Sequence, residues 1–224
     1  MRRYTIGHIN YNKDAYNKYL GPSLENLEGN FDVITTSSEN KPAQNYNEII
    51  DKSPNDYIIL LHEDVSFSPV LLRNIDETIN LLEEKQIGFS SLGIVGRIYN
   101  NSMNYLVEWC KPSEIYRYET VDCCFILIDK RQGIKFDDFT FNDFHLYVED
   151  YCIQAEEKTG LGCYSIFMQG AESSTVSHIL HKIKNDPYIL HHSVTVNERG
   201  TCWGRYSEYK DYLYRKYNRL IKTT

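Results

Sequence analysis

The stretch YIILLHEDV, residues 57–65, decides the fold because five apolar residues run directly into three polar ones. An uninterrupted apolar run of this length, rich in isoleucine and leucine, predicts a central parallel strand that is covered on both faces. In an open α/β sheet, ligands bind just beyond the carboxyl ends of the strands. Glu63 and Asp64 therefore stand where a hard cation or a phosphate-bearing substrate would be held. Ordinary acids at a solvated strand end explain the same two residues equally well.

Composition places the chain among soluble globular domains. Its 224 residues are 42% hydrophobic and 25% charged, enough for one large domain or a domain with an appendage. The formal net charge of −7 argues against a general nucleic-acid surface. Tyrosine dominates the aromatic residues, with 19 against 9 phenylalanines and 2 tryptophans. Tyrosine suits clefts for sugars and nucleobases, and it suits half-buried packing, its commoner use.

Cysteine spacing and the lack of long apolar runs bear on location. The six cysteines include no C-x-x-C pair, so we expect no structural zinc site. Most of them fall in apolar segments, as free thiols do in a reducing compartment. The first residues, MRRYTIG, lack the apolar core of a signal peptide, and no apolar run approaches membrane-spanning length. We therefore expect a cytoplasmic protein.

Apolar patterns along the chain predict alternating strands and helices. Leu72, Ile75, Ile79 and Leu82 recur at spacings of three and four residues and mark one helix face. The alternation in the first half implies an α/β fold with a mostly parallel central sheet flanked by helices. The second half is less regular, and residues 170–187 have no assignment. The expected strands are 4–9, 31–36, 57–61, 93–98, 122–128 and 163–168, and the expected helices are 43–53, 72–82 and 148–159.

The tail from residue 203 to 222 is basic and rich in tyrosine, and it predicts a helix. We divide the chain into a main domain, residues 1–202, and this C-terminal helix, residues 203–224. One interpretation is a peripheral contact with a partner or with the anionic inner face of a membrane. The other is an amphipathic helix that packs its aromatic residues on the domain and leaves its basic face in solvent. Charge runs are usually solvated surface, so we favour packing.

Two further clusters carry groups suited to chemistry. Glu149 and Asp150 lie at the start of an expected helix, where the macrodipole alone favours acidic residues. The functional alternative is a general base at a cleft, which needs an ionised carboxylate within hydrogen-bond reach of an acceptor hydroxyl. His191 and His192 are adjacent, and such a pair can bind a metal or a phosphate, although it is more often structural or exposed.

Taken together and in order, these motifs resemble family 2 glycosyltransferases of the GT-A fold, specifically their short glycosyltransferase-like branch. The resemblance runs from about residue 4 to about residue 205 and rests on the order of the motifs. The matching segments are NYN at 10–12, AQNYN at 43–47, HEDV at 62–65, FHLYVEDYC at 144–152 and HHS at 191–193.

The resemblance implies transfer of a sugar from a UDP- or GDP-linked donor to a saccharide or lipid-linked acceptor, usually with inversion, in the synthesis of a surface polysaccharide or glycoconjugate. It also implies a divalent cofactor, Mn²⁺ or Mg²⁺. Asp64 becomes the metal ligand, with His191 and Glu63 as further candidates. Such an ion prefers carboxylate oxygens and offsets the charge that grows on the leaving diphosphate.

The same resemblance assigns the base and the donor site. Asp150 is the expected catalytic base, with Glu149 beside it. Inversion needs a base on the face opposite the leaving group, and the same logic governs inverting hydrolases. The expected donor-binding residues are Asn10, Ser38, Glu39, Asn45 and Asp64.

The chain departs from the family pattern at two places. The usual Asp-x-Asp is replaced by His62-Glu63-Asp64, and the second strand ends in Ser38-Glu39 where many relatives have an acidic pair.

Two alternative functions can be compared with this expectation. A nucleotidyltransferase on a related sheet needs a glycine-rich, basic phosphate loop near the first strand, and residues 7–10 do not supply one. The main alternative is a non-catalytic sugar- or nucleotide-binding module, because a fold alone does not prove activity.

Overall fold

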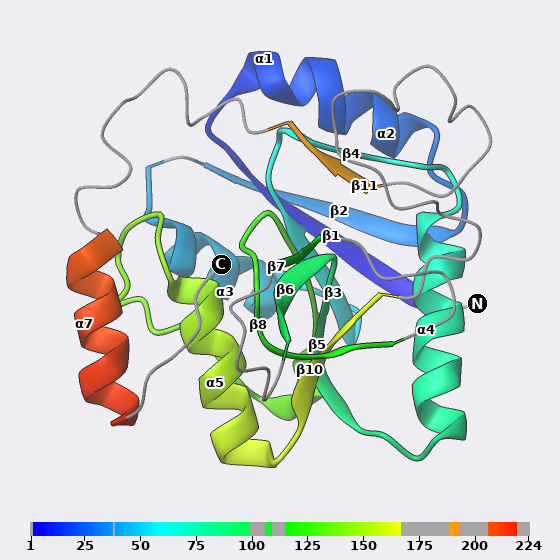
Figure 1. Ribbon diagram of the computed structural model, residues 1–224. Coiled ribbons are helices and arrows are strands. Elements are labelled where there is room, and N and C mark those ends of the chain that lie inside the picture. Colours follow the sequence, from blue (N-terminus) through cyan, green and yellow to red (C-terminus); the bar gives the residue numbers. More distant parts are fainter. Residues whose placement is uncertain are drawn as a thin grey trace.

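The computed structural model describes residues 2–37, 39–98, 106–108, 115–166, 189–192 and 206–218, and Figure 1 shows their arrangement. Two of the segments discussed above, Ser38 and residues 170–187, lie outside this part of the chain. The described residues form a nine-stranded sheet, a separate two-stranded sheet, and helices on both faces of the larger sheet.

The strands of the large sheet lie in the order β2-β1-β3-β9-β5-β10-β8-β6-β7. The small sheet pairs β4 with β11. The bounds are β1 (Arg3–Asn10), β2 (Asn30–Ser37), β3 (Tyr57–Leu61), β4 (Val65–Phe67), β5 (Phe89–Gly93), β6 (Val95–Ile98), β7 (Leu106–Glu108), β8 (Arg117–Val121), β9 (Phe125–Asp129), β10 (Gly162–Ser165) and β11 (Ile189–His191).

Strand β3 lies at the centre of the fold, as its continuous apolar run predicts. All five of its residues are buried. Ile58 and Leu60 belong to the hydrophobic cluster on one face of the sheet, whereas Tyr57, Ile59 and Leu61 belong to the cluster on the other. Side chains alternate between the faces of a strand, so a strand covered on both faces needs apolar residues at every position.

The α/β class is confirmed, and the sheet is mixed. Six strands (β1, β2, β3, β5, β6 and β10) run in one direction, whereas β7, β8 and β9 run in the other. Among the described strands, β1–β2, β1–β3 and β5–β10 are the parallel pairs, because β9 lies antiparallel between β3 and β5 and β8 lies antiparallel between β10 and β6. An apolar run predicts a buried strand but not its direction, so these antiparallel pairs refine the expected mostly parallel sheet to a mixed one.

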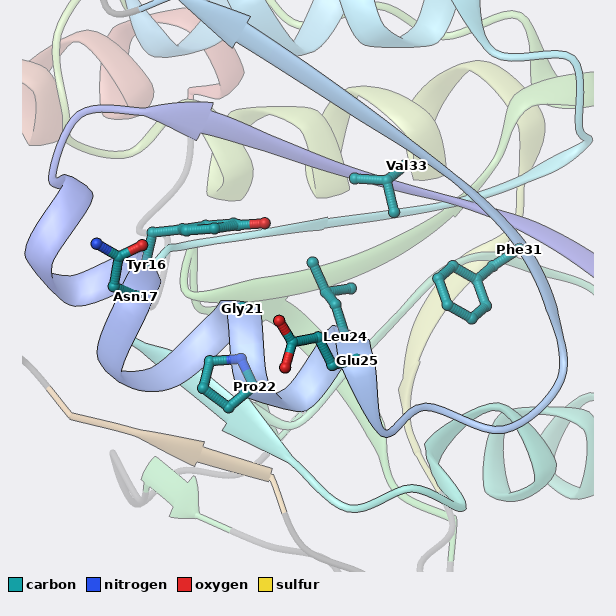
Figure 2. Close-up of a pocket in the computed structure, with 8 residues that line it drawn as sticks. All are labelled: Tyr16, Asn17, Gly21, Pro22, Leu24, Glu25, Phe31 and Val33. Carbon is teal, nitrogen blue, oxygen red and sulfur yellow. The ribbon is translucent and has the colours of Figure 1, made fainter.

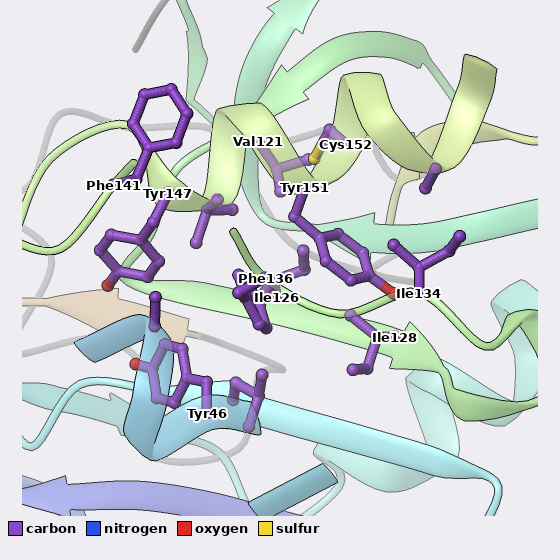
Figure 3. Close-up of a cluster of buried hydrophobic side chains, with 14 of the residues drawn as sticks. Tyr46, Val121, Ile126, Ile128, Ile134, Phe136, Phe141, Tyr147, Tyr151 and Cys152 are labelled. Carbon is purple, nitrogen blue, oxygen red and sulfur yellow. The ribbon is translucent and has the colours of Figure 1, made fainter. Parts of the chain in front are cut away.

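Two groups of helices cover the two faces of the large sheet (Figure 1). Helices α3, α5 and α7 contribute to the first hydrophobic cluster, and η1, α2 and α4 contribute to the second. Figure 3 shows the first cluster, where Tyr46, Tyr147 and Tyr151 pack around Phe136. The bounds are α1 (Lys13–Ala15), the π-helix η1 (Tyr16–Leu20), α2 (Gly21–Glu25), α3 (Pro42–Lys52), α4 (Leu71–Glu84), the 3₁₀-helix η2 (Lys130–Gln132), α5 (Tyr147–Thr159) and α7 (Tyr206–Tyr217).

The three helices expected within the main domain form α3, α4 and α5. The four apolar residues that mark the helix face of α4, Leu72, Ile75, Ile79 and Leu82, are all fully buried. The expected strand over 93–98 is instead divided between β5 and β6. Helices α1 and α2 and the strands β4, β8 and β11 are elements that the sequence pattern did not predict.

The C-terminal helix α7 packs on the rest of the molecule. Tyr209 and Leu213 are fully buried in the cluster that α3 and α5 also form, whereas Lys210 and Arg215 are exposed. The division of the chain into a main domain and a C-terminal helix stays a prediction. In the part of the chain described, no helix is long and apolar enough to cross a membrane. The proposed boundary at residue 202 lies outside that part.

Candidate active site

The carboxyl ends of β1, β2 and β3 meet at one edge of the sheet, which we call the carboxyl edge. Strand β1 lies between β2 and β3 and is parallel to both, with Asn10 opposite Ser37 in the register. The loops that follow the three strands therefore come together at this edge. Asn10 is the last residue of β1, and the loops carry Glu39, Glu63 and Asp64 among the residues expected from sequence to form the site.

Glu63 holds the loop after β1. Its two carboxylate oxygens both accept hydrogen bonds from the backbone N–H of Asn12, at 2.9 and 3.1 Å. The side chain of Asn12 in turn caps α1 by accepting from the N–H groups of Asp14 and Ala15. Burial raises the pKa of Glu63, and the backbone hydrogen bonds oppose that shift. This carboxylate thus fixes the backbone of residues 10–12.

Asp64 is the second acid after β3, and its side chain is only 4% exposed. Its Oδ1 lies 4.0 Å from Nδ1 of His62. Its backbone C=O accepts a hydrogen bond from the N–H of His192 at 2.9 Å, next to the antiparallel pair β4–β11 in which His191 is opposite Val65. The structure therefore brings the strand that carries His191 directly beside Asp64, although the two are far apart in sequence.

These residues bear on the expected divalent cation. Among the side chains that the structure describes, no group of three or more His, Cys, Asp or Glu residues could hold a metal ion. The side chain of His191 is not among them, so a ligand pair of Asp64 and His191 stays a prediction. The neighbouring His192 is engaged elsewhere: its Nε2 lies 2.8 Å from Oγ of Ser66, and its ring stacks on Tyr19.

The start of α3 closes the carboxyl edge on the side of β2. Asn45 is fully buried, and its Nδ2 donates to the backbone C=O of Asn40 at 2.9 Å. The Tyr11 hydroxyl donates to the same carbonyl, also at 2.9 Å. Glu39 and Asn10 are exposed nearby. The structure thus gathers three of the expected donor-binding residues here in addition to Asp64.

Glu149 and Asp150 lie in the first turn of α5, as expected. The residue before the helix, Leu146, is buried and has a left-handed backbone with φ of 62°. This conformation is uncommon for a residue with a side chain and persists where the surroundings enforce it. The entry into α5, and with it the direction in which each acid projects, is therefore fixed by packing.

Asp150 faces α7. It is fully buried, and its Oδ1 accepts hydrogen bonds from Nζ of Lys216 and from the hydroxyl of Tyr217, each at 2.7 Å. Lys216 also pairs with Asp137 at 2.9 Å. Burial raises the pKa of Asp150, and the contacts with Lys216 and Tyr217 oppose that shift. The expected base is therefore held in an ion pair with the C-terminal helix, a contact that sequence spacing does not reveal.

Glu149 lies on a different side of α5. It is 3% exposed, and its charge acts on the thiol of Cys123, whose pKa is raised mainly by burial. The Tyr147 hydroxyl also acts on the pKa of this thiol, and it lies 3.5 Å from Nε2 of His62. His62 also lies next to Asp64, so neighbouring side chains connect the surroundings of Glu149 with the carboxyl edge.

Two shallow pockets lie along the outer part of the sheet. The larger has a volume of about 500 Å³, and Figure 2 shows Tyr16 and Asn17 together with Phe31 and Val33 in its lining. The smaller, of about 250 Å³, shares the first two of these residues and reaches Asn10. Asn10 is the expected site residue that lines a pocket in the described part of the chain; the lining of neither pocket includes the two acids after β3.

His8 of β1 lines the smaller pocket, and the sequence assigned it no role. It is 2% exposed, its Nε2 lies 2.9 Å from Oγ1 of Thr35, and its ring stacks on Tyr16. Burial lowers the pKa of His8 to about 4, so the imidazole is neutral at pH 7. The only sequence signal was a histidine within an otherwise largely apolar strand.

Comparison with solved structures identifies the type of fold. The structure of S. aureus TarS residues 1–349 matches with a TM-score of 0.53 at 12% identity, over 74% of this chain and 58% of that chain. The complex of the same TarS fragment with UDP-GlcNAc matches with a TM-score of 0.50 at 11% identity, over 78% and 60%. The complex with UDP gives 0.50 at 12% identity, over 75% and 58%. These neighbours are GT-A-type glycosyltransferases, and the fold of this chain is of that type.

The chain spans about three-fifths of the length of these structures. No family model matches its sequence, and no curated protein matches it. At such low identity the likeness shows the fold alone.

Proposed function

We propose that the protein is a family 2 glycosyltransferase of the short branch, which transfers a sugar from a nucleoside diphosphate donor to an acceptor hydroxyl with inversion. The observation that carries this proposal is the position of Asp64. It is a buried carboxylate just after the central strand of a GT-A fold, and its backbone is bonded to the segment that carries His191. Ligands of open α/β sheets bind at this edge.

Asp64 and His191 are the residues proposed to hold Mn²⁺ or Mg²⁺. A buried carboxylate oxygen suits either ion, and imidazole is a further ligand that transition metals accept. When bound, the ion would offset the negative charge that develops on the leaving diphosphate. Glu63 was the third candidate ligand. Because both of its oxygens bind the Asn12 N–H, we assign it to holding the loop after β1.

The proposed donor site surrounds the nucleoside with Asn10, Ser38, Glu39 and Asn45, and places the diphosphate near Asp64. The similar TarS structures contain UDP-GlcNAc and UDP, which supports a UDP-linked donor; a GDP-linked donor is the alternative. The proposed acceptor is a saccharide or lipid-linked hydroxyl in surface polysaccharide or glycoconjugate synthesis, on the cytoplasmic side of the membrane.

The proposed chemistry is a single displacement at the anomeric carbon. The acceptor oxygen forms its bond to this carbon while the bond to the diphosphate breaks, and the electron pair of that bond leaves with the diphosphate. The hydroxyl proton passes to a carboxylate, a step typically worth about 10²–10⁴ in rate. The acids proposed for this step are those in the first turn of α5, Glu149 and Asp150.

Calorimetric titration of UDP, GDP and their common sugar conjugates, with and without Mn²⁺, tests the donor site. We expect metal-dependent binding by the wild type and a loss of affinity of about tenfold or more in Asp64→Ala. Asp56→Ala is the matched control, because this exposed acid immediately precedes β3 at the opposite edge. No binding of any nucleotide under either condition would contradict the proposal.

A non-catalytic sugar- or nucleotide-binding module is the second candidate. The ion pair that occupies Asp150 favours it, since that acid is the base the family resemblance implies. A wild-type protein that binds a nucleotide sugar yet neither transfers nor hydrolyses it would support this candidate over the enzyme.

A further inference from the structure

We infer that the two adjacent acids at the start of α5 have separate tasks: Asp150 anchors the C-terminal helix, and Glu149 is the carboxylate that accepts the proton of the acceptor hydroxyl. This inference rests on the proposed glycosyltransferase function for Glu149. The anchoring by Asp150 can be tested without it.

The anchor is an ion pair between a buried acid and a partly exposed lysine, and it lies within a larger contact. Asp150 is fully buried and receives both Lys216 and the Tyr217 hydroxyl on one oxygen, at 2.7 Å each. The same hydroxyl also lies 3.3 Å from the backbone carbonyl of Asp150. Lys216 is shared with Asp137 and sits 5.6 Å from the centre of the Phe141 ring. The other oxygen, Oδ2, has no hydrogen-bond partner among the described residues, but the side chain has no exposed surface that an acceptor hydroxyl could reach while α7 is docked.

The rest of α7 supports the same contact. Tyr209 and Leu213 are fully buried, and the Tyr209 hydroxyl donates to Oδ1 of Asn142 at 3.0 Å. Helix α7 therefore contacts the loop before α5 through the Tyr209 hydroxyl and the Lys216 ammonium group, and it also buries Leu213. Removing a charge from such an interface leaves its partner buried without compensation, which is strongly destabilising.

Glu149 is placed toward the carboxyl edge. Successive residues of an α-helix project about 100° apart, so adjacent acids cannot both face α7. Glu149 lies near the thiol of Cys123 and the Tyr147 hydroxyl, which is 3.5 Å from Nε2 of His62. The other ring nitrogen of His62 is 4.0 Å from Asp64, the residue proposed to hold the metal ion. Glu149 is therefore the acid of the pair that shares its surroundings with the donor site.

The first turn of a helix also suits a carboxylate that must be ionised before it accepts a proton. The positive end of the helix dipole stabilises the charged form there. In the step proposed, Glu149 takes the hydroxyl proton as the acceptor oxygen bonds to the anomeric carbon and the diphosphate leaves with its electron pair. No other reactant is needed.

Thermal unfolding tests the anchor. We expect Lys216→Met to lower the melting temperature by about 5 °C or more, because it leaves Asp150 buried without its cation. Asp150→Asn combined with Lys216→Met should recover most of that loss, since neither charge remains. Lys210→Met, at an exposed position of α7, is the matched control and should change nothing. Losses that simply add in the double variant would overturn the anchor.

Turnover with the donor found by calorimetry tests the base. Glu149→Gln should lose about 10²-fold or more in kcat, with UDP affinity and melting temperature unchanged. Glu157→Gln, at an exposed acid on the same helix, is its control and should leave kcat unchanged. Normal turnover by Glu149→Gln, or loss of turnover by Asp150→Asn without a change in melting temperature, would overturn the assignment.

The two failures can be told apart. A wild type that transfers no sugar from any nucleotide donor would overturn the proposed function and the role of Glu149 with it. The melting temperatures of the Asp150 and Lys216 variants would still decide whether α7 is anchored as inferred.

Discussion

Two pairs of adjacent acids belong to the candidate site: Glu63 and Asp64 at the carboxyl edge, after β3, and Glu149 and Asp150 at the start of α5. In each pair, one acid is bonded to a neighbouring segment. Glu63 binds the loop after β1, and Asp150 binds α7. The other acids, Asp64 and Glu149, lie near a shared group of side chains. His62 is 4.0 Å from Asp64 and 3.5 Å from the Tyr147 hydroxyl, and Glu149 acts on the neighbouring Cys123 thiol.

The two anchoring acids differ in what they bind. Glu63 accepts hydrogen bonds from a backbone N–H, so its partner carries no net charge. Asp150 binds a lysine and a tyrosine hydroxyl, so loss of the lysine leaves a buried carboxylate without its cation. Neighbouring acids at a candidate site therefore need not share a task, because their side chains contact different segments of the chain.

Glu63→Ala should produce the largest loss of stability among the following changes. It removes the acceptor of the Asn12 N–H together with a buried side chain, and we expect a loss of about 2–3 kcal/mol in the free energy of unfolding, measured with urea. Glu48→Ala is the control, because Glu48 forms an i, i+4 ion pair with Lys52 on the surface of α3. Its loss should stay near 0.5 kcal/mol. Similar losses in the two variants would contradict the anchoring role of Glu63.

Tyr217→Phe, which changes the contact between Asp150 and α7, should reduce the stability by less. It deletes the hydroxyl that binds Asp150 and leaves the lysine in place, so we expect a loss of about 1–2 kcal/mol in the free energy of unfolding. Tyr214→Phe removes a hydroxyl from an exposed tyrosine on the same helix and should leave the stability unchanged. A Tyr217→Phe protein as stable as that control would show that the hydroxyl does not help to anchor α7.

The smallest expected effect concerns pH. Burial raises the pKa of Glu63 above its ordinary value of 4.5, so the folded state binds this proton more tightly than the unfolded state does. The contribution of Glu63 is therefore most favourable below its ordinary pKa and is lost as pH rises through the raised pKa. In urea unfolding from about pH 4 to about pH 7, the stability of the wild type relative to Glu63→Gln should fall as pH rises. A constant difference, or one that grows with pH, would be the opposite of this expectation.

Much of the fold could be predicted from sequence, because local patterns carry it. The apolar run of β3 and the spaced apolar residues of α4 specify a doubly covered strand and a helix face without reference to any partner. The antiparallel directions of β8 and β9 could not be predicted, because a buried apolar strand has the same residue pattern in a parallel or an antiparallel pair. Short elements such as α1 and β4 lacked a pattern long enough to detect.

The candidate site also contains features that the sequence predicts and features that only tertiary packing decides. The position of Asp64 follows from the end of β3, and that prediction needed only the local run. The roles of Glu63 and Asp150 depend on partners 51 and 66 residues away, Asn12 and Lys216. No spacing rule connects such positions, because tertiary packing alone brings them together. The sequence could therefore identify the acids but not separate the anchors from the groups that face the site.

The most direct test of this division is the Mn²⁺-dependent affinity for UDP of Glu63→Gln and Asp64→Asn, measured side by side by calorimetry. The two variants make the same change in charge at adjacent positions. We predict that Glu63→Gln stays within about threefold of the wild type and that Asp64→Asn loses about tenfold or more. A loss in Glu63→Gln as large as that in Asp64→Asn would contradict the account, because it would make Glu63 a ligand of the ion.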